Sequence, residues 1–568
     1  MILRLSLVLA FALAAVAASG DFRLRAEATG LKSPRAQAAR LESIAPPAPK
    51  LVDRARANAV QFETAVAATR RLLHVWLTHA DRRTLLLPDR LDVERAKWIY
   101  TPHNSGADLY PYLILTAQLT DPDLYGGRML EMLRNEVRYT SAKASVPGNL
   151  TFATGELGPA SLFGAGEYAK DGLVAVTEYL GRTPWFHRMV DMTADAMEQA
   201  AMTSRFGKLP AADTELNGDY LQALTRLAVM TGDRRFLDWA RRIGDAYIDE
   251  VLPGNFGVPG MEWDFTTHSG DRRLRLRDHG NETVVGLTLL LAIEHQLSSD
   301  REPRYRVAVQ RMLDRILQSA QPDGMLYNEV DAETLKPLDS RLSDNWGYVY
   351  GAVYTYYQIT GETKYRDRVR HVLSSLSKYR NYVWEPGRNL PLGSFDGYAD
   401  SIESAIYLVN REPLPEALDW IESEMKVMLA MQRADGHIED WYGEGNFNRT
   451  SLLYAYMKSL GVRPARWEAG VRVGAVIDGK RLVLSLTAPS PRRIQFDYAR
   501  HRRVLNLEKN LVRLNEFPEW FTVDENTLYR VGRSGTPGEV RLGSELIEGV
   551  TLEPGEWIIE SPVVKRGL

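Results

Sequence analysis

The chain has 568 residues, of which 45% are hydrophobic and 25% charged, the balance of a folded globular protein and not of a disordered or collagen-like one. Lys and Arg number 70 against 73 Asp and Glu, so the net charge of -3 offers no positive field for phosphate backbones, and no nucleic-acid partner is expected. Cysteine is absent, which excludes disulfides, thiolate nucleophiles and Cys-ligated metal centres.

Residues 1–20 have the pattern of a secretory signal peptide. Arg4 is their one charged residue, and an apolar stretch over 5–18 precedes small residues. That stretch is shorter than the roughly 20 residues that span a bilayer. We therefore expect a secreted or periplasmic protein with no membrane anchor after signal cleavage. Residues 21–50, with four prolines, are expected to form a loose N-terminal lead-in.

Over residues 51–470, pairs of amphipathic stretches recur, each pair joined by a short turn that carries Gly, Asp or Pro. Gly ends one helix, and Asp, Thr or an early Pro starts the next, so each turn predicts two antiparallel helices. The turns recur roughly every 50 to 70 residues, which is typical of stacked helical units. They lie at 120–123, 181–184, 231–233, 299–303, 360–363, 411–413 and 461–464.

The links between successive pairs are long, irregular and polar, unlike those of a regular solenoid. Examples are 256–280, 322–344, 383–396 and 435–446. We therefore expect a mainly α fold, an (α/α)6 or (α/α)7 toroid over 51–470. Antiparallel pairs place the short turns on one face and the long links on the other, which can carry function.

From about Val471 the apolar residues alternate with a period of two. The sequence Asp478-Gly479 lies between two apolar runs and is a strong hairpin signal. Residues 471–568 are therefore expected to form a small antiparallel β-sandwich domain. We favour a stabilising appendage without a site of its own.

The long links bring polar side chains to the starts of the next helices. Helix N-termini carry about half a positive charge each, so a ring of them favours an anionic ligand. Fork-shaped arginines at 272–277 and at Arg449 suit a carboxylate, although the 272–277 run is equally compatible with a solvated surface. Ordinary helix capping is the competing interpretation for Asp219, Asp344 and Asp396.

The densest polar window runs from Glu262 to Glu282, with aromatic, acidic, basic and His residues together. The expected catalytic residues are Glu282 and Asp344, supported by His279 and Asp219. His279 and Glu282 are three apart, a weak metal signal, and we expect no metal and no cofactor. Substrate contacts are expected from Asn217, Trp263, His268, Arg277, Trp346, Tyr348, Tyr398, Trp441 and Arg449.

This layout of polar and aromatic helix starts resembles the α/α-toroid carbohydrate-active enzymes. The resemblance is to unsaturated glucuronyl hydrolases, related glucuronidases, and heparinase and alginate lyases that append a β domain. It covers residues 50–560 and is one of layout, without a family-defining motif. It implies a partner that is an acidic polysaccharide or oligosaccharide.

Three functions are compatible with this resemblance. In a glycoside hydrolase, the Glu282 and Asp344 carboxyl groups would act as acid and base. In a polysaccharide lyase acting by β-elimination, Asn217, His268, His279 and Tyr348 would neutralise the uronate and move protons. A noncatalytic glycan-binding protein would need the aromatic groove alone. We favour the hydrolase because carboxylates outnumber His at the helix starts.

Overall fold

The computed structural model describes residues 43–277, 280, 282–386, 393–441 and 443–560. The expected signal peptide, most of the lead-in and His279 lie outside these residues, so those expectations stay predictions. Within the described ranges, every helix is too short or too polar to cross a membrane.

Seven helical runs form a closed inner ring in the part of the chain that the structure describes. Each contacts the next, and the last returns to the first through the contacts of α18 with α3 and η3. The expected ring is thus present, with seven pairs. The inner runs are η3 (Pro102–Leu109) with α3 (Tyr110–Thr120), α6 (Leu162–Glu167) with η5 (Tyr168–Leu173) and α7 (Val174–Leu180), α9 (Thr214–Thr231), α12 (Glu282–Gln296), α14 (Trp346–Thr360), α16 (Phe395–Val409) and α18 (Glu444–Ser459).

An outer helix packs behind each inner run. The outer set is α2 (Pro49–Leu77), α4 (Pro122–Leu124) with η4 (Tyr125–Met129) and α5 (Leu130–Thr140), α8 (Pro184–Glu198), α10 (Arg234–Ala246) with η6 (Tyr247–Val251) and α11 (Leu252–Gly254), α13 (Glu302–Gln318), α15 (Thr363–Ser375) and α17 (Pro415–Ala430). Six of the seven predicted turns join two helices, whereas the seventh, at 461–464, leads from α18 into the C-terminal strands. Asp121 and Asp233 cap the helices that follow, and Gly232 and Gly361 end α9 and α14 in the left-handed conformation.

Burial separates the two rings. All sixteen residues of α18 are buried, whereas only six of the seventeen in α13 are, which is the pattern of an outer amphipathic helix. Gly445 lets the ring close, because a Cβ at this position would lie 2.0 Å from the Asp108 carbonyl oxygen. The start of α18 therefore packs directly on the backbone of η3.

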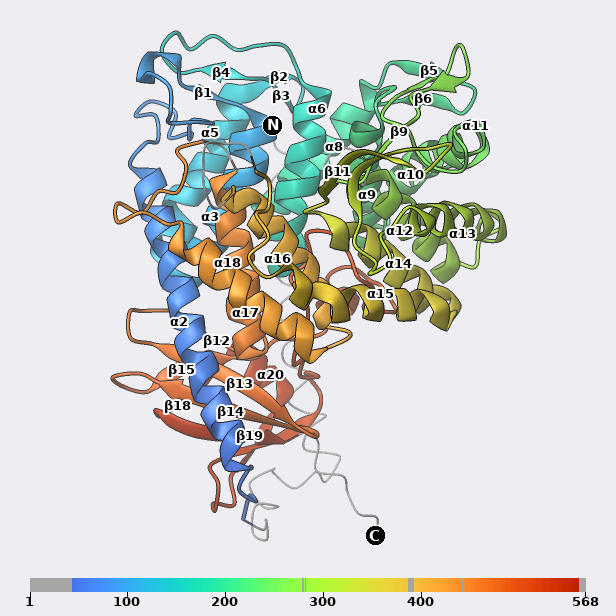
Figure 1. Cartoon of the computed structure of the whole chain (residues 1–568). Coiled ribbons are helices and arrows are strands. Elements are labelled where there is room, and N and C mark those ends of the chain that lie inside the picture. The colour runs from blue at the N-terminus through green and yellow to red at the C-terminus, as the bar shows by residue number, and fades with distance from the viewer. Residues whose placement is uncertain (1–42, 278–279, 281, 387–392, 442, 561–568) are drawn as a thin grey trace, which may run out of the picture.

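The C-terminal strands are antiparallel, as expected, but a sandwich is not confirmed. A five-stranded sheet has the order β13-β14-β19-β16-β17, and a separate three-stranded sheet has the order β12-β15-β18. Helix α2 lies along the larger sheet (Figure 1), and a Cβ at Gly474 would lie 2.2 Å from the Ala55 carbonyl oxygen. The strands are β12 (Arg463–Pro464), β13 (Arg472–Asp478), β14 (Arg481–Thr487), β15 (Arg492–Gln495), β16 (Leu528–Gly532), β17 (Glu539–Leu542), β18 (Val550–Leu552) and β19 (Gly555–Glu560), with the short helices α19 (Arg500–Arg503) and α20 (Gly543–Glu548) between them.

Two further features bear on the site. On the long-link face, β9 (Arg273–Arg275), β10 (Tyr327–Asp331) and β11 (Pro337–Leu342) form a small sheet. The smaller two-stranded sheets pair β1 (Ile99–Tyr100) with β4 (Leu150–Thr151), β2 (Ser141–Lys143) with β3 (Val146–Pro147), β5 (Met202–Ser204) with β6 (Gly207–Leu209), and β7 (Trp263–Asp264) with β8 (Ser269–Gly270).

Residues 505–519, here named the inserted segment, pack against the inner helices. Arg226 donates to the backbone carbonyl of Leu514, and Thr355 donates to that of Val512.

Candidate active site

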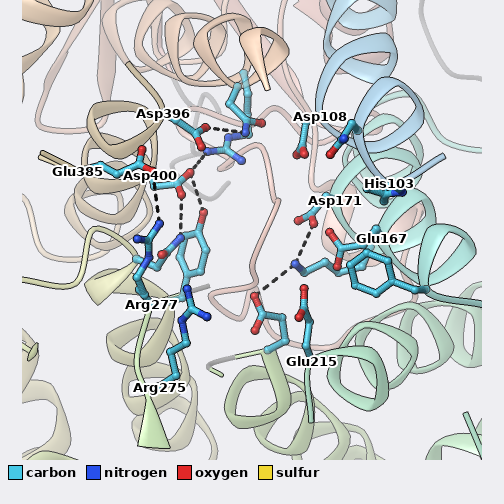
Figure 2. A pocket seen from close by; sticks show the side chains of 18 of the residues that line it. His103, Asp108, Glu167, Asp171, Glu215, Arg275, Arg277, Glu385, Asp396 and Asp400 are labelled. Carbon is cyan, nitrogen blue, oxygen red and sulfur yellow. Dashed lines mark hydrogen bonds and ion pairs between the residues drawn. The ribbon is translucent and has the colours of Figure 1, made fainter. Parts of the chain in front are cut away.

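A polar cavity of about 350 Å³ opens where the inner helices begin, within the size range of small-molecule sites. Eight carboxylates, three arginines and one lysine line it among the described residues. Figure 2 shows Asp108, Glu167 and Asp171 on one side, and Asp396, Asp400 and Glu385 on the other. The lining carboxylates are Asp108, Glu167, Asp171, Glu215, Glu282, Glu385, Asp396 and Asp400.

Lys170 on η5 organises one side of the cavity. Its Nζ lies 2.9 Å from Asp171 Oδ2, 3.4 Å from Glu282 Oε1 and 3.6 Å from Asp219 Oδ1. Burial opposes the charge of Asp171, but Lys170 and hydrogen bonds that include one from Asn515 hold the pKa of this carboxyl below its usual range. Asp171 is therefore ionised at neutral pH.

Asp108 on η3 has the opposite character. Burial raises the pKa of Asp108 well above its usual value, and the negative charges of Asp171 and Asp396 raise it further. Arg449 and Lys170 oppose the shift only in part. Asp108 therefore keeps its proton to a higher pH than Asp171 does.

Arg449 on α18 organises the other side. Its guanidinium pairs with Asp400 and lies 2.7 Å from Glu403 Oε2. The Tyr348 hydroxyl donates to Glu403 at 3.0 Å, and Asn345 donates to Asp400 at 2.8 Å. Burial raises the pKa of Glu403 to about 8 despite Arg449. This group ties α14, α16 and α18 together beneath the cavity.

Two of the cavity's arginines lie at the end of β9 and just after it, at Arg275 and Arg277. Arg277 reaches Glu385 at 3.7 Å and Asp344 at 3.8 Å, whereas the Arg275 guanidinium has no ion pair or hydrogen bond within the described ranges. Arg272 and Arg273 of the same run are exposed and pair with Asp331 and Asp271. The run is thus divided, with one half at the surface and the other in the cavity.

Five of the residues expected from the sequence line this cavity: Glu282, Arg277, Tyr348, Trp441 and Arg449. Asp219 and Asp344 are buried behind it, beside Lys170 and Arg277. Asp219 lies deeper than expected because α9 begins at Thr214, capped by Asp213, which places Asp219 in its second turn. For Asp344 the packing does not support direct contact with a substrate.

Five other expected contacts lie away from the cavity. Trp263 and His268 both bond to Glu250, the latter with its side chain 63% exposed. The Asn217 amide donates to two backbone carbonyls at the start of α9. Trp346 and Tyr398 are buried against Ser401 and the Tyr382 carbonyl. These departures from the expectation share a cause, since each of the five side chains hydrogen-bonds to a polar atom of the fold itself.

Several cavity residues were not assigned roles by sequence reasoning, among them Asp108, Lys170, Asp171, Glu215 and Asp400. A usable signal is present nonetheless. Carboxylates four residues apart recur at Glu167 and Asp171, Glu215 and Asp219, and Asp396 and Asp400. Such like-charge spacing weakens a helix by a few tenths of a kcal/mol. Its repetition on three inner helices therefore indicates a shared site.

One group among the described residues has the composition of a metal site: His437, Asp440 and Glu444. Its carboxylates are already engaged, because Glu444 accepts three backbone N–H groups and the Trp76 indole, and Asp440 pairs with Arg433. We interpret the group as the anchor of the loop before α18.

No family model matches the chain, and no curated protein matches its sequence. Solved structures similar to it include an unsaturated glucuronyl hydrolase from Bacillus sp. GL1, at 14% identity and a TM-score of 0.37, over 51% of this chain and 85% of that one. Another is the family 76 glycoside hydrolase (mannosidase) Bt3792 from Bacteroides thetaiotaomicron VPI-5482, at 12% identity and a TM-score of 0.40, over 69% and 98%. A sugar epimerase from a ruminal bacterium has 13% identity and a TM-score of 0.40, over 55% and 87%.

Proposed function

We propose that this protein is an exported glycoside hydrolase that cleaves uronic-acid-containing glycans by carboxylate acid/base catalysis. The feature that carries the proposal is a pair of carboxyl groups in one cavity, Asp108 and Asp171, whose pKa values are shifted in opposite directions. Neighbouring titratable groups whose pKa values are pushed apart are the mark of an acid and a base that work together. The leader pattern of residues 1–20 supports the export.

The proposed roles differ from those expected at Glu282 and Asp344. Asp108, kept protonated, would donate its proton to the leaving glycosidic oxygen. Asp171, kept ionised, would activate water or attack the anomeric carbon. Glu282 remains in the cavity, paired with Lys170. Its negative charge would stabilise the positive charge that develops on the sugar ring.

Arg275 supports a uronic-acid substrate. Its guanidinium is unpaired among the described residues and lines the cavity, so a carboxylate on the sugar would gain a charge-assisted, two-pronged hydrogen bond there. Trp441 and Phe163 line the same cavity and supply apolar faces for a sugar ring.

The β-elimination alternative has less support. Asn217 and His268 lie away from the cavity, and burial beside Asp400 and Glu403 raises the pKa of Tyr348 well above its usual value, so this hydroxyl is a poor base. His279 lies outside the described residues.

The test is incubation with a panel of uronic-acid oligosaccharides and polysaccharides, followed by assays of new reducing ends and of ultraviolet absorbance. New reducing ends without the absorbance of a conjugated double bond are expected. That absorbance would instead identify a lyase, and binding without cleavage would identify a glycan-binding protein. Either result contradicts the proposal. Sequencing the N-terminus of the mature protein from the exported fraction tests the leader.

A further inference from the structure

The inserted segment reaches the cavity from the C-terminal part of the chain. Asn515 is 2% exposed, and its side-chain amide donates to Asp171 Oδ1 at 3.0 Å and to the Lys170 carbonyl at 2.9 Å. One amide thus holds both the carboxylate and the backbone of η5. This contact links residues 344 positions apart in sequence.

Buried ion pairs anchor the segment inside the ring. Arg513 lies 3.0 Å from Glu178 on α7, and Glu178 also pairs with Arg226 on α9. On the far side, Glu516 lies 2.8 Å from Arg411, which follows α16. Separating such a pair would leave a buried charge uncompensated, which is costly. The segment is therefore held in place on both sides. Asn515 therefore lies at a fixed position under the cavity.

We propose that Asn515 is a positioning residue that holds the Asp171 carboxylate in its reactive place, so that the C-terminal part of the chain completes the active site of the ring. The inference rests on the proposed role of Asp171. It revises the expected role of residues 471–568 as a stabilising appendage without a site of its own. Asn515 itself does not line the cavity and acts through Asp171.

The charged and titratable groups around Asp171 come from several elements. They are Lys170 and Glu167 on its own helical run, Asp108 and Tyr112 from η3 and α3, and Tyr348 and Glu403 from α14 and α16. Lys170 favours the ionised form of Asp171, and the neighbouring carboxylates oppose it whenever they are charged. Two neutral donors also hydrogen-bond to Asp171 and lower its pKa: the carboxyl group of Glu167, whose own pKa is raised by burial, and the amide of Asn515. Loss of the Asn515 amide should therefore shift the titration of Asp171 upward.

The chain provides a matched control for this test. Asn515 and Asn506 both lie in the inserted segment with positive φ, 59° and 52°, and each donates its amide to a helix backbone carbonyl. Asn506 is at the surface, against Val229. Glycine adopts positive φ without strain, so Asn515→Gly and Asn506→Gly each remove a side chain and leave the backbone relaxed.

The experiment measures kcat and KM against pH for both glycine variants, for the isosteric Asn515→Asp, and for Asp171→Asn. For both Asn515 variants we expect the acidic limb of the kcat/KM profile to move up by about one pH unit. We also expect kcat to fall about tenfold while KM stays within about twofold. Asn506→Gly should match the unaltered protein.

Unchanged profiles and kcat in both Asn515 variants, with Asp171→Asn inactive, would overturn this inference and leave the proposed function standing. Full activity in Asp171→Asn would instead overturn the proposed role of Asp171, and the inference with it. Equal effects of Asn515→Gly and Asn506→Gly would reduce Asn515 to a general structural role.

Discussion

Asp108 and Asp171 face one cavity from neighbouring π-helical segments, and their carboxyl groups have opposite pKa shifts. The difference comes from their partners. Lys170 and Asn515 bind Asp171, whereas Asp108 is half-buried in the cavity wall and feels the negative charges of Asp171 and Asp396. π-Helical turns inside helices often occur at functional sites. The two segments thus place a carboxyl group with a raised pKa near one with a lowered pKa.

The proposed acid can be tested by its dependence on the leaving group. Asp108→Asn should lower kcat by about 10²- to 10⁴-fold on a glycan, because the carboxamide cannot donate the proton. The loss should be much smaller on an aryl glycoside, whose leaving group needs no protonation. Glu424→Gln is the control, since burial also raises the pKa of Glu424 but this residue lies outside the cavity. Equal losses on both substrates would argue against general-acid catalysis by Asp108.

Lys170 should contribute strongly to stability. Lys170→Met leaves Asp171 and Glu282 without their shared cation, which should lower the free energy of unfolding by about 3–5 kcal/mol at neutral pH. Lowering the pH protonates these carboxylates, so the deficit should shrink in acid. Denaturant unfolding at both pH values measures it.

Lys458 provides the control for that substitution. Burial lowers the pKa of Lys458 to about 7, so its charge is already partly lost at neutral pH. Lys458→Met should therefore cost less than Lys170→Met. A deficit in Lys170→Met that is the same at neutral and acidic pH would contradict the electrostatic explanation.

Arg275 should select acidic substrates. Arg275→Ala should raise KM for a uronic-acid oligosaccharide about tenfold or more, in line with the loss of a charge-assisted hydrogen bond, and should change KM little for a neutral one. Arg273→Ala is matched, because Arg273 lies two residues away on β9 but is exposed and pairs with Asp271. If both variants bind the acidic substrate alike, Arg275 is not the uronate contact.

Glu403 should make stability fall as pH rises. Its pKa is about 8 in the folded protein against an ordinary value of 4.5, so the folded state holds a proton that the unfolded state has lost between these values. The stabilisation is complete below about pH 4.5 and is lost as pH rises to about 8, at up to about 1.4 kcal/mol per pH unit. Glu403→Gln should flatten this slope in unfolding measurements. An unaltered slope in the variant would place the ionisation elsewhere.

Much of the architecture could be predicted from local sequence. Gly, Asp and Pro determine where one helix ends and the next begins, so six of the seven turns join two helices as predicted; the seventh, at 461–464, leads into a strand. The number of pairs followed only from the ring contacts of α18 with η3 and α3. The sandwich is not confirmed, because helix α2 packs on the larger sheet. This packing joins distant parts of the chain: the Asn58 amide donates to the Ala475 carbonyl, 417 positions away in sequence.

The site was harder to predict because helix capping and catalysis use the same residue types. Asp213, and not Asn217 or Asp219, caps α9, and this shift of one turn changes which side chains face the cavity. The contact of Asn515 with Asp171 has no local signal, since it depends on how a distant segment enters the ring. The repeated i, i+4 carboxylates were the pattern that sequence reasoning could have used.

The central claim is that Asp108 is protonated and Asp171 ionised at neutral pH. Difference infrared spectroscopy between the unaltered protein and its Asp108→Asn and Asp171→Asn variants measures this directly. We expect Asp108→Asn to remove the band of a protonated carboxyl group and Asp171→Asn to remove that of a carboxylate. Loss of a carboxylate band in Asp108→Asn, or of a protonated band in Asp171→Asn, would contradict the account.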